Sequence, residues 1–152
     1  MKRGYMTTKP ILLVEDTPDD AELTVMSLKR SGLLNEVIIA EDGLEALDYL
    51  FGKGRYAGRN AEDTPALILL DIKMPRLDGI EVLQRLRADK RTSVLPVVML
   101  TTSNEDVDLA RAYESGANAY VHKPVSLAQF QEAVRQLGLF WILTNEPPKP
   151  PR

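Results

Sequence analysis

Acidic side chains directly follow two of the most apolar segments of this sequence. Residues 67–70, LILL, run into Asp71, and residues 11–14, ILLV, run into Glu15 and Asp16. Such apolar runs predict strands that are covered on both faces, as in a parallel sheet. A strand of this kind cannot continue through an ionised carboxylate. The acids are therefore expected where the strands end, at the sheet edge where open α/β folds bind ligands.

Two further predicted strands end in a hydroxyl group and an amine. Residues 96–100, PVVML, lead into Thr101, and residues 119–122, AYVH, lead into Lys123. Because parallel strands present their carboxyl ends on one edge of a sheet, the threonine and the lysine are expected beside the acids. The sequence therefore predicts an acidic pocket that contains one lysine and one threonine.

This combination of side chains suits phosphoryl transfer. The carboxylates of Glu15, Asp16 and Asp71 outnumber the ammonium group of Lys123, and hard divalent cations such as Mg²⁺ neutralise such an excess through carboxylate oxygens and water. With the cation bound, Asp71 supplies a carboxylate of the type that attacks phosphorus. Lys123 and Thr101 are then placed to contact oxygens of the acyl phosphate.

Each of these residues taken alone has a simpler interpretation. An acidic pair before a helix, as at Glu15 and Asp16, is more often a helix cap. Thr101 alone is a strand-end hydroxyl, and Lys123 alone is a solvated lysine beside a proline. Asp71 has fewer structural explanations, although capping and turn formation remain open. The agreement of four strand ends, rather than any single residue, leads to the prediction of a common site.

Alternating strands and helices must position these residues. Strands are predicted at 11–14, 36–40, 67–71, 96–100 and 119–122, and helices at 18–31, 43–51, 80–90, 105–115 and 127–137. Thr17, Asp42 and Ser126 are expected to cap three of the helices. Strands separated by helices run parallel with right-handed crossovers. The predicted fold class is therefore α/β, a doubly wound, five-stranded parallel sheet with helices on both faces.

The composition describes one globular domain with ordinary surface charge. The chain has 152 residues, of which 44% are hydrophobic, a formal net charge of −3 and no cysteine. The charge balance argues against a nucleic-acid partner and a polybasic membrane anchor, and the lack of cysteine excludes disulfides and thiolate chemistry. No apolar segment is long enough for a membrane span or a signal-peptide core, so the cytoplasm is the expected location.

The predicted elements divide the chain into three parts. Residues 1–9 are expected to be a flexible N-terminal segment, residues 10–138 the domain, and residues 139–152 an extension that begins with LFWIL and ends in the proline-rich EPPKPPR. Five consecutive apolar residues at 139–143 cannot all face one core along a helix. We expect a two-fold homodimer that buries this extension together with the last strand and the last helix, with folding back over the domain as the alternative.

Five short motifs resemble those of the CheY-like receiver domain of bacterial two-component response regulators. They are VED at 14–16, LLDIKMPRLDG at 69–79, LTTS at 100–103, GANAY at 116–120 and KP at 123–124. The motifs occur in the order typical of the family, and the resemblance covers roughly residues 10–138. It implies a flavodoxin-like sheet with the strand order 2-1-3-4-5.

The resemblance implies roles for the acidic residues and for one backbone carbonyl. Asp71 matches the phosphoacceptor of the family. Asp16, Asp71 and the backbone carbonyl of Lys73 match its Mg²⁺ ligands, and Glu15 matches a residue that acts through the water shell of the metal. Mg²⁺ is therefore the implied cofactor.

Two phosphoryl contacts and one switch residue are implied as well. Thr101 and Lys123 match the residues that contact the phosphoryl group, and Tyr120 matches an aromatic residue that turns inward when the threonine moves. The Lys123–Pro124 bond matches a cis peptide, which costs little only before proline. The side chain of Lys73, two residues after the acceptor, is expected to reach over a bound phosphoryl group.

The resemblance implies a phosphoacceptor protein rather than an enzyme. Such a receiver takes a phosphoryl group from a sensor histidine kinase and signals by conformational change or phosphorelay, and the segment after Gly138 is too short for an output domain. The long loop predicted at 52–65 and the apolar residues 140–143 resemble stand-alone receivers that partner phytochrome-type histidine kinases.

Two other functions stay open at this point. One is a Mg²⁺-dependent phosphatase with an aspartyl-phosphate intermediate, and the other is an interaction module that is never phosphorylated. The phosphatase needs a general acid close to its nucleophile, whereas the next polar position after Asp71 is Lys73. The complete set of strand-end residues argues against the unreactive module.

Overall fold

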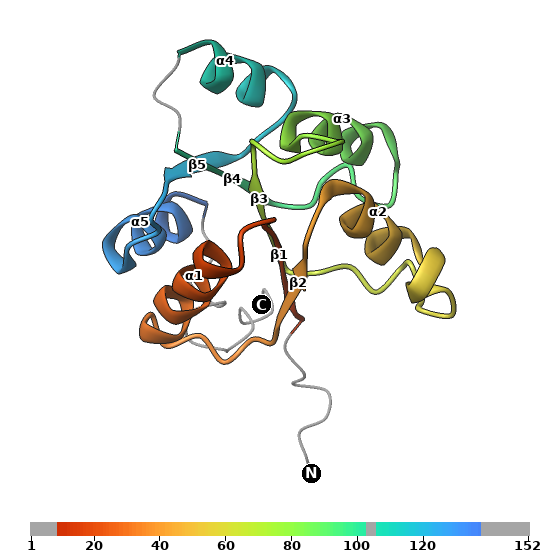
Figure 1. Ribbon diagram of the computed structural model, residues 1–152, viewed down its shortest axis with the longest axis horizontal. Coiled ribbons are helices and arrows are strands. Elements are labelled where there is room, and N and C mark those ends of the chain that lie inside the picture. The colour runs from red at the N-terminus through yellow and green to blue at the C-terminus, as the bar shows by residue number, and fades with distance from the viewer. Residues whose placement is uncertain (1–8, 103–105, 138–152) are drawn as a thin grey trace, which may run out of the picture.

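The computed structural model describes residues 9–102 and 106–137. Most of the predicted N-terminal segment and the whole predicted extension at 139–152 lie outside the described residues. The described elements form one parallel sheet with helices on both of its faces (Figure 1). The predicted α/β class is therefore confirmed.

The sheet has the strand order β2-β1-β3-β4-β5 that the resemblance implied. The strands are β1 (Ile11–Val14), β2 (Val37–Ala40), β3 (Leu67–Asp71), β4 (Val97–Thr101) and β5 (Ala119–His122). Every residue of β1, β3 and β4 is buried, because helices cover both faces of these central strands. Pro96 lies just outside β4, contrary to the prediction, since it has no N–H group to donate to a ladder.

The five helices fall into two layers. They are α1 (Pro18–Arg30), α2 (Gly43–Phe51), α3 (Gly79–Ala88), α4 (Asp106–Glu114) and α5 (Leu127–Leu137). Figure 1 shows α1 and α5 on one face of the sheet and α2, α3 and α4 on the other. Two apolar cores result, and alternate strand residues point into them: Leu12 and Leu70 belong to one, Leu13 and Leu69 to the other. No described helix is both long and apolar enough to cross a membrane.

Two predicted helix caps are confirmed. A carboxylate oxygen of Asp42 accepts a hydrogen bond from the backbone N–H of Glu45 at 2.8 Å. The hydroxyl of Ser126 accepts one from the backbone N–H of Gln129 at 3.1 Å. These caps fix where α2 and α5 begin, at the edge of the sheet that carries the strand-end residues.

The predicted cap at Thr17 is wrong. The Thr17 side chain makes no capping hydrogen bond to α1. Its backbone N–H instead donates to Glu15 Oε2 at 3.2 Å, and Pro18 begins the helix with no N–H group to satisfy. The turn between β1 and α1 is therefore held by the carboxylate of Glu15.

The loop predicted at 52–65 is partly ordered. It contains one turn of 3-10 helix at Gly54–Tyr56. Arg59 donates to the backbone carbonyl of Tyr49 at 2.6 Å, and its guanidinium lies 3.9 Å from the centre of the Tyr49 ring. These contacts attach the loop to α2.

Candidate functional site

The strand-end residues converge on one edge of the sheet, as predicted. Glu15 directly follows β1, Asp71 is the last residue of β3, Thr101 is the last residue of β4, and Lys123 directly follows β5. Asp71 pairs with Leu100 in the ladder, and the backbone N–H of Lys123 donates to the carbonyl of Thr101 at 2.8 Å. The parallel register alone therefore gathers these side chains.

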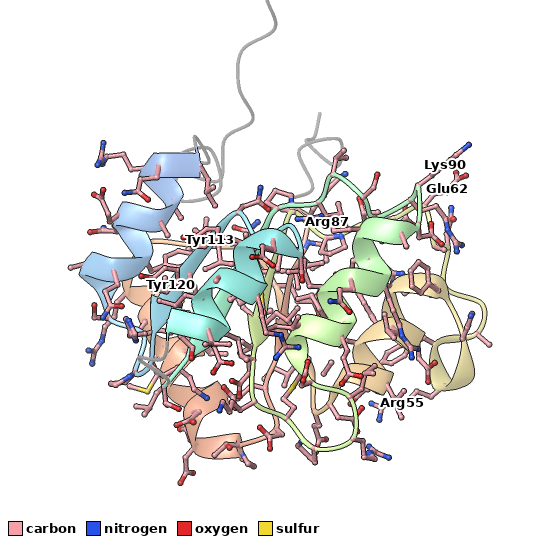
Figure 2. All side chains as sticks on the ribbon, turned by 90° about the horizontal axis from the view of Figure 1, so that it is seen from above. Arg55, Glu62, Arg87, Lys90, Tyr113 and Tyr120 are labelled. Atoms are coloured by element: carbon pink, nitrogen blue, oxygen red, sulfur yellow. The ribbon has the colours of Figure 1, made fainter. Side chains whose placement is uncertain are left out.

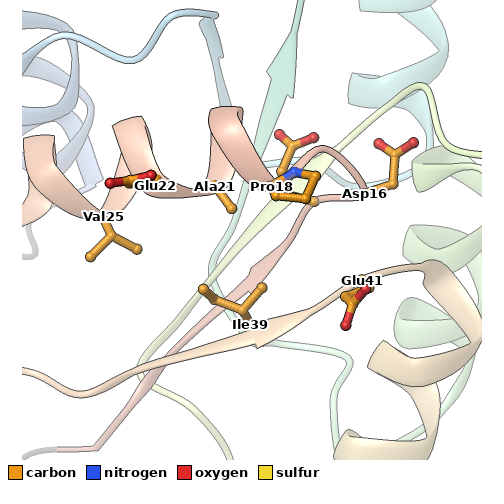
Figure 3. A pocket seen from close by; sticks show the side chains of 8 residues that line it. Asp16, Pro18, Ala21, Glu22, Val25, Ile39 and Glu41 are labelled. Carbon is orange, nitrogen blue, oxygen red and sulfur yellow. The ribbon is translucent and has the colours of Figure 1, made fainter.

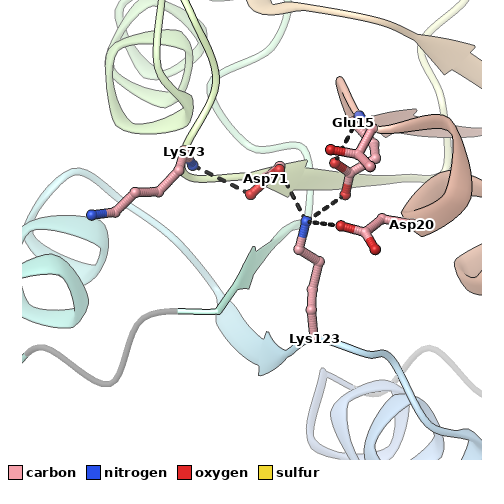
Figure 4. A network of polar contacts seen from close by, with 6 residues as sticks. Glu15, Asp20, Asp71, Lys73 and Lys123 are labelled. Carbon is pink, nitrogen blue, oxygen red and sulfur yellow. Dashed lines mark hydrogen bonds and ion pairs between the residues drawn. The ribbon is translucent and has the colours of Figure 1, made fainter.

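Lys123 is the centre of the polar network (Figure 4). Its ammonium nitrogen lies 2.8 Å from Glu15 Oε1, 3.0 Å from Asp20 Oδ2 and 3.1 Å from Asp71 Oδ2. The Lys123 side chain is only 8% exposed. A lysine has three N–H donors, and each of them has a carboxylate partner here. The network therefore holds Lys123 against the proposed acceptor.

Asp20 is the site residue that the sequence analysis missed. Its position in the first turn of α1 has a sufficient local explanation, because the helix macrodipole favours acids there. The predicted fold also pointed to Asp20, because every helix that follows a parallel strand begins at the edge of the sheet that binds ligands. The structure adds Asp20 to the predicted set as a partner of Lys123.

Three of the carboxylates are close enough to share a metal ion. Glu15, Asp16 and Asp71 each offer one oxygen, and these oxygens lie within 4.8 Å of one another. An all-oxygen donor set with excess negative charge suits a hard divalent cation such as Mg²⁺. The residues present therefore fit the implied metal. The backbone carbonyl of Lys73, in the loop after β3, stays a predicted ligand.

Burial and hydrogen bonding shift the pKa values of Glu15 and Lys123. Burial raises the pKa of Glu15 to about 7, with a further rise from neighbouring Asp71 and an opposing effect of the hydrogen bond from Lys123. Burial alone would lower the pKa of Lys123, but its hydrogen bonds to Glu15 and Asp20 outweigh that effect and raise it. Lys123 is therefore held in its charged form, whereas Glu15 is close to taking up a proton.

The predicted switch residues lie on neighbouring strands. Thr101 is fully buried at the end of β4. Tyr120, on β5, packs edge-on against Tyr113 of α4 with ring centres 5.8 Å apart, and Figure 2 shows the two side by side. Its ring also lies 5.6 Å from that of His122. The switch role itself stays a prediction.

Lys73 lies beside Asp71, but its side chain does not reach over the acceptor. Its backbone N–H donates to Asp71 Oδ1 at 3.3 Å. Its ammonium group points away from Asp71 (Figure 4) and pairs with Asp108 Oδ2 on α4 at 3.6 Å. Without a phosphoryl group, the lysine therefore pairs with a buried carboxylate on α4, and its expected position over a bound phosphoryl group stays a prediction.

A cavity of about 550 Å³ opens beside the acids, between α1 and β2 (Figure 3). Ala21, Val25 and Ile39 form its apolar wall, and it shares Glu15 and Asp16 with the site. Asp71, Thr101 and Lys123 do not line it. The cavity is therefore a neighbouring recess, separate from the proposed acceptor.

Gly79 fixes the backbone of the proposed acceptor. Its N–H donates to the carbonyl of Ile72 at 2.8 Å, and Asp78 opens α3 in a capping box with Glu81. A Cβ atom at Gly79 would lie 2.2 Å from the backbone oxygen of Asp71. Only glycine therefore fits between α3 and the end of β3.

Replacing Gly79 with alanine is expected to destabilise the protein by about 1–3 kcal/mol, because the new methyl group must displace the Asp71 backbone. Urea unfolding measures the change. Arg85→Ala, at an exposed position of the same helix, is the control and should change the free energy of unfolding by less than about 0.5 kcal/mol. Equal stabilities for Gly79→Ala and the control would contradict this packing.

Comparison with known proteins identifies a matching family. The family model of the response regulator receiver domain matches residues 11–135. The response regulator Rcp1 of Synechocystis sp. is 38% identical over 136 residues, which cover 90% of this chain and 90% of Rcp1.

Solved structures agree with this match. The bacteriophytochrome response regulator AtBRR is 52% identical with a TM-score of 0.79, over 88% of this chain and 95% of AtBRR. The bacteriophytochrome response regulator RtBRR is 52% identical with a TM-score of 0.82, over 93% of this chain and 84% of RtBRR. The Mn²⁺-bound form of Rcp1 has a TM-score of 0.73 at 38% identity, over 93% of this chain and 99% of Rcp1.

Proposed function

Because the chain belongs to the response regulator receiver domain family, we propose that it accepts a phosphoryl group on Asp71 from a sensor histidine kinase, with the help of Mg²⁺. The family resemblance noted in the sequence motifs is thereby confirmed. One observation carries the assignment to Asp71. The Asp71 side chain is 5% exposed, contacts Lys123 and lies close to Glu15 and Asp16.

The proposed reaction moves one phosphoryl group from nitrogen to oxygen. A carboxylate oxygen of Asp71 attacks phosphorus, a P–O bond forms, and the P–N bond to the kinase histidine breaks with its electron pair left on the imidazole. Lys123 lies 3.1 Å from Asp71 Oδ2 and is placed to transfer a hydrogen bond to a phosphoryl oxygen. Thr101, at the end of the neighbouring strand, is the proposed hydroxyl donor.

The carboxylates of Asp16 and Asp71 and the carbonyl of Lys73 would hold Mg²⁺, with Glu15 acting through its water shell. Bound Mg²⁺ would neutralise charge on the carboxylates and on the incoming phosphoryl oxygens. Support comes from the donor set itself, in which three acidic oxygens lie within 4.8 Å of one another.

We prefer the receiver function to the phosphatase and to the unreactive module because of the residues around Asp71. The residue that follows Asp71 is the buried Ile72, and Lys73 turns away to Asp108, so neither supplies the general acid of a phosphatase. The network of Lys123 with three carboxylates supports a reactive site over an inert module.

Incubation with acetyl phosphate separates the three functions. A receiver should gain one phosphoryl group in intact-mass spectra, and only when Mg²⁺ is present. An inert module would gain none with or without Mg²⁺. A phosphatase would steadily release phosphate from p-nitrophenyl phosphate. Either of the last two results would contradict the proposal.

The proposed partner is a phytochrome-type sensor histidine kinase. AtBRR and RtBRR are bacteriophytochrome response regulators by name, and each is 52% identical to this chain. Within residues 10–138, which we propose as the receiver domain, the signal would leave by conformational change at Tyr120 or by phosphorelay. The cytoplasmic location and the lack of nucleic-acid and membrane partners stay predictions.

We also propose a two-fold homodimer through β5, α5 and the extension at 139–152. β5 is an edge strand, and α5 packs beside it. The apolar residues 139–143 that motivate the dimer lie outside the described residues. Sedimentation equilibrium should give a dimer for the full chain and a monomer for a chain that ends at Gly138. A full-length monomer at high micromolar concentration, with Mg²⁺ and beryllofluoride present, would refute the dimer.

A further inference from the structure

One ion pair connects the acceptor loop to α4. Lys73 Nζ lies 3.6 Å from Asp108 Oδ2. The two ends differ in environment, because the Lys73 side chain is 60% exposed whereas Asp108 as a residue is 8% exposed. Lys73 is at the same time tied to the acceptor through its backbone, whose N–H donates to Asp71 Oδ1. A single residue therefore touches both the proposed acceptor and a helix on the other side of the loop.

Asp108 is an unusual anchor for a helix. Among the side chains of α4 that the structure describes, only Asp108 and Ala112 are buried. Within the described residues, Asp108 Oδ2 has no hydrogen-bond partner, and its ion pair is with Lys73 alone. A buried carboxylate without a compensating charge is costly. The ion pair with the Lys73 ammonium group is therefore one of the contacts that attach α4 to the domain, beside the buried Ala112.

The ion pair between Lys73 and Asp108 borders an open space. Lys73 and Asp108 line a cavity of about 410 Å³ together with Asp78 and Arg111. The Lys73 stem begins next to Asp71, so its ammonium group is on a flexible four-carbon tether near both partners. A phosphoryl group on Asp71 would carry a charge of about −1.5 to −2, more than the single charge of Asp108.

We propose that Lys73 pairs with Asp108 in the resting protein and moves to the phosphoryl group when Asp71 is phosphorylated. We call this the reserve role of Lys73. The movement of the lysine uncouples α4 from the acceptor loop. This inference rests on the proposed function, since it needs a phosphoryl group at Asp71. The competing interpretation is an ordinary surface ion pair, which contributes little. The burial of Asp108 and the lack of a hydrogen bond to its Oδ2 favour the first interpretation.

A double-mutant cycle read by hydrogen exchange of the α4 amides tests the inference. The variants are Lys73→Met, Asp108→Asn and the pair, each measured alone and with Mg²⁺ and beryllofluoride, which mimics the phosphoryl group. In the resting protein, Lys73→Met should speed α4 exchange by roughly three-fold or more, and it should have no effect when Asp108→Asn is present. With beryllofluoride bound, this coupling should vanish.

Matched controls remove a similar charge elsewhere. Lys90→Met, at an exposed lysine after α3, and Glu114→Gln, at an exposed acid near the end of α4, should leave the exchange rates and their response unchanged. The effect of the ion pair on α4 exchange can also be measured in the wild-type protein, without any substitution. Salt at about 1 M shortens the Debye length to about 3 Å and should speed α4 exchange in the resting form only.

Fluorine NMR of bound beryllofluoride separates this inference from the proposed function. If beryllofluoride binds with Mg²⁺ and the coupling between Lys73 and Asp108 stays the same, the reserve role is wrong while the acceptor site stands. No coupling in the resting protein would also overturn the reserve role. If wild-type protein binds no beryllofluoride, the proposed acceptor site itself fails.

Discussion

Asp71→Asn is expected to abolish phosphoryl acceptance while leaving the fold intact. An amide has the shape of the carboxylate but not its nucleophilic oxygen, so the rate of labelling by acetyl phosphate should fall by about a thousand-fold or more. The fold should survive because Lys123 keeps its hydrogen bonds to Glu15 and Asp20. Intact-mass spectra over time give the rate, and urea unfolding tests the fold.

Asp63→Asn is the matched control for this experiment. Asp63 is an exposed acid in the loop at 52–65, far along the chain from the strand ends that form the site. The control variant should be labelled at the wild-type rate. Labelling of Asp71→Asn at a rate close to the wild-type rate would mean that another residue is the acceptor.

The second large effect concerns the metal. Asp16→Asn should lower the affinity for Mg²⁺ by at least about ten-fold, since even the loss of a group that only supports a ligand commonly costs that much. The ammonium group of Lys123 donates to Glu15, Asp20 and Asp71, so the variant should keep the lysine network. Isothermal titration calorimetry measures the affinity. Chelation of divalent ions should stop labelling of the wild-type protein altogether.

Asp19→Asn provides the comparison for Asp16→Asn. Asp19 is exposed in the first turn of α1 and does not belong to the acidic group whose oxygens lie close together. Its replacement should leave Mg²⁺ affinity within about two-fold of wild type, because an exposed charge is largely screened. Equal losses in the two variants would point to a general charge effect and against a metal site at Asp16.

The position of the site was predictable from the sequence because it follows from backbone rules. Asp71 and Glu15 come directly after apolar runs, and parallel strands must present their carboxyl ends on one edge. No side-chain geometry was needed for that step. The strand order, by contrast, came from the family that the motifs resemble, whereas the confirmed caps at Asp42 and Ser126 follow from local sequence.

The details that the sequence did not predict depend on distant partners. Asp20 has a local explanation as a first-turn acid, and only the fold shows that Lys123 lies against it. The direction of the Lys73 side chain is set by Asp108, which lies 35 positions further along the sequence. The need for glycine at Gly79 arises from its close approach to the Asp71 carbonyl. Each of these contacts is tertiary, so no local pattern encodes it.

Phosphoryl acceptance on Asp71 is tested most directly by phosphotransfer from a purified, phosphorylated histidine kinase of the phytochrome type, followed by mapping of the modified residue. Borohydride reduction converts an aspartyl phosphate into a stable residue that tandem mass spectrometry locates. We predict one modified position, Asp71, and no modification when Mg²⁺ is chelated. Modification at another residue, or transfer that continues without a divalent ion, would contradict this prediction.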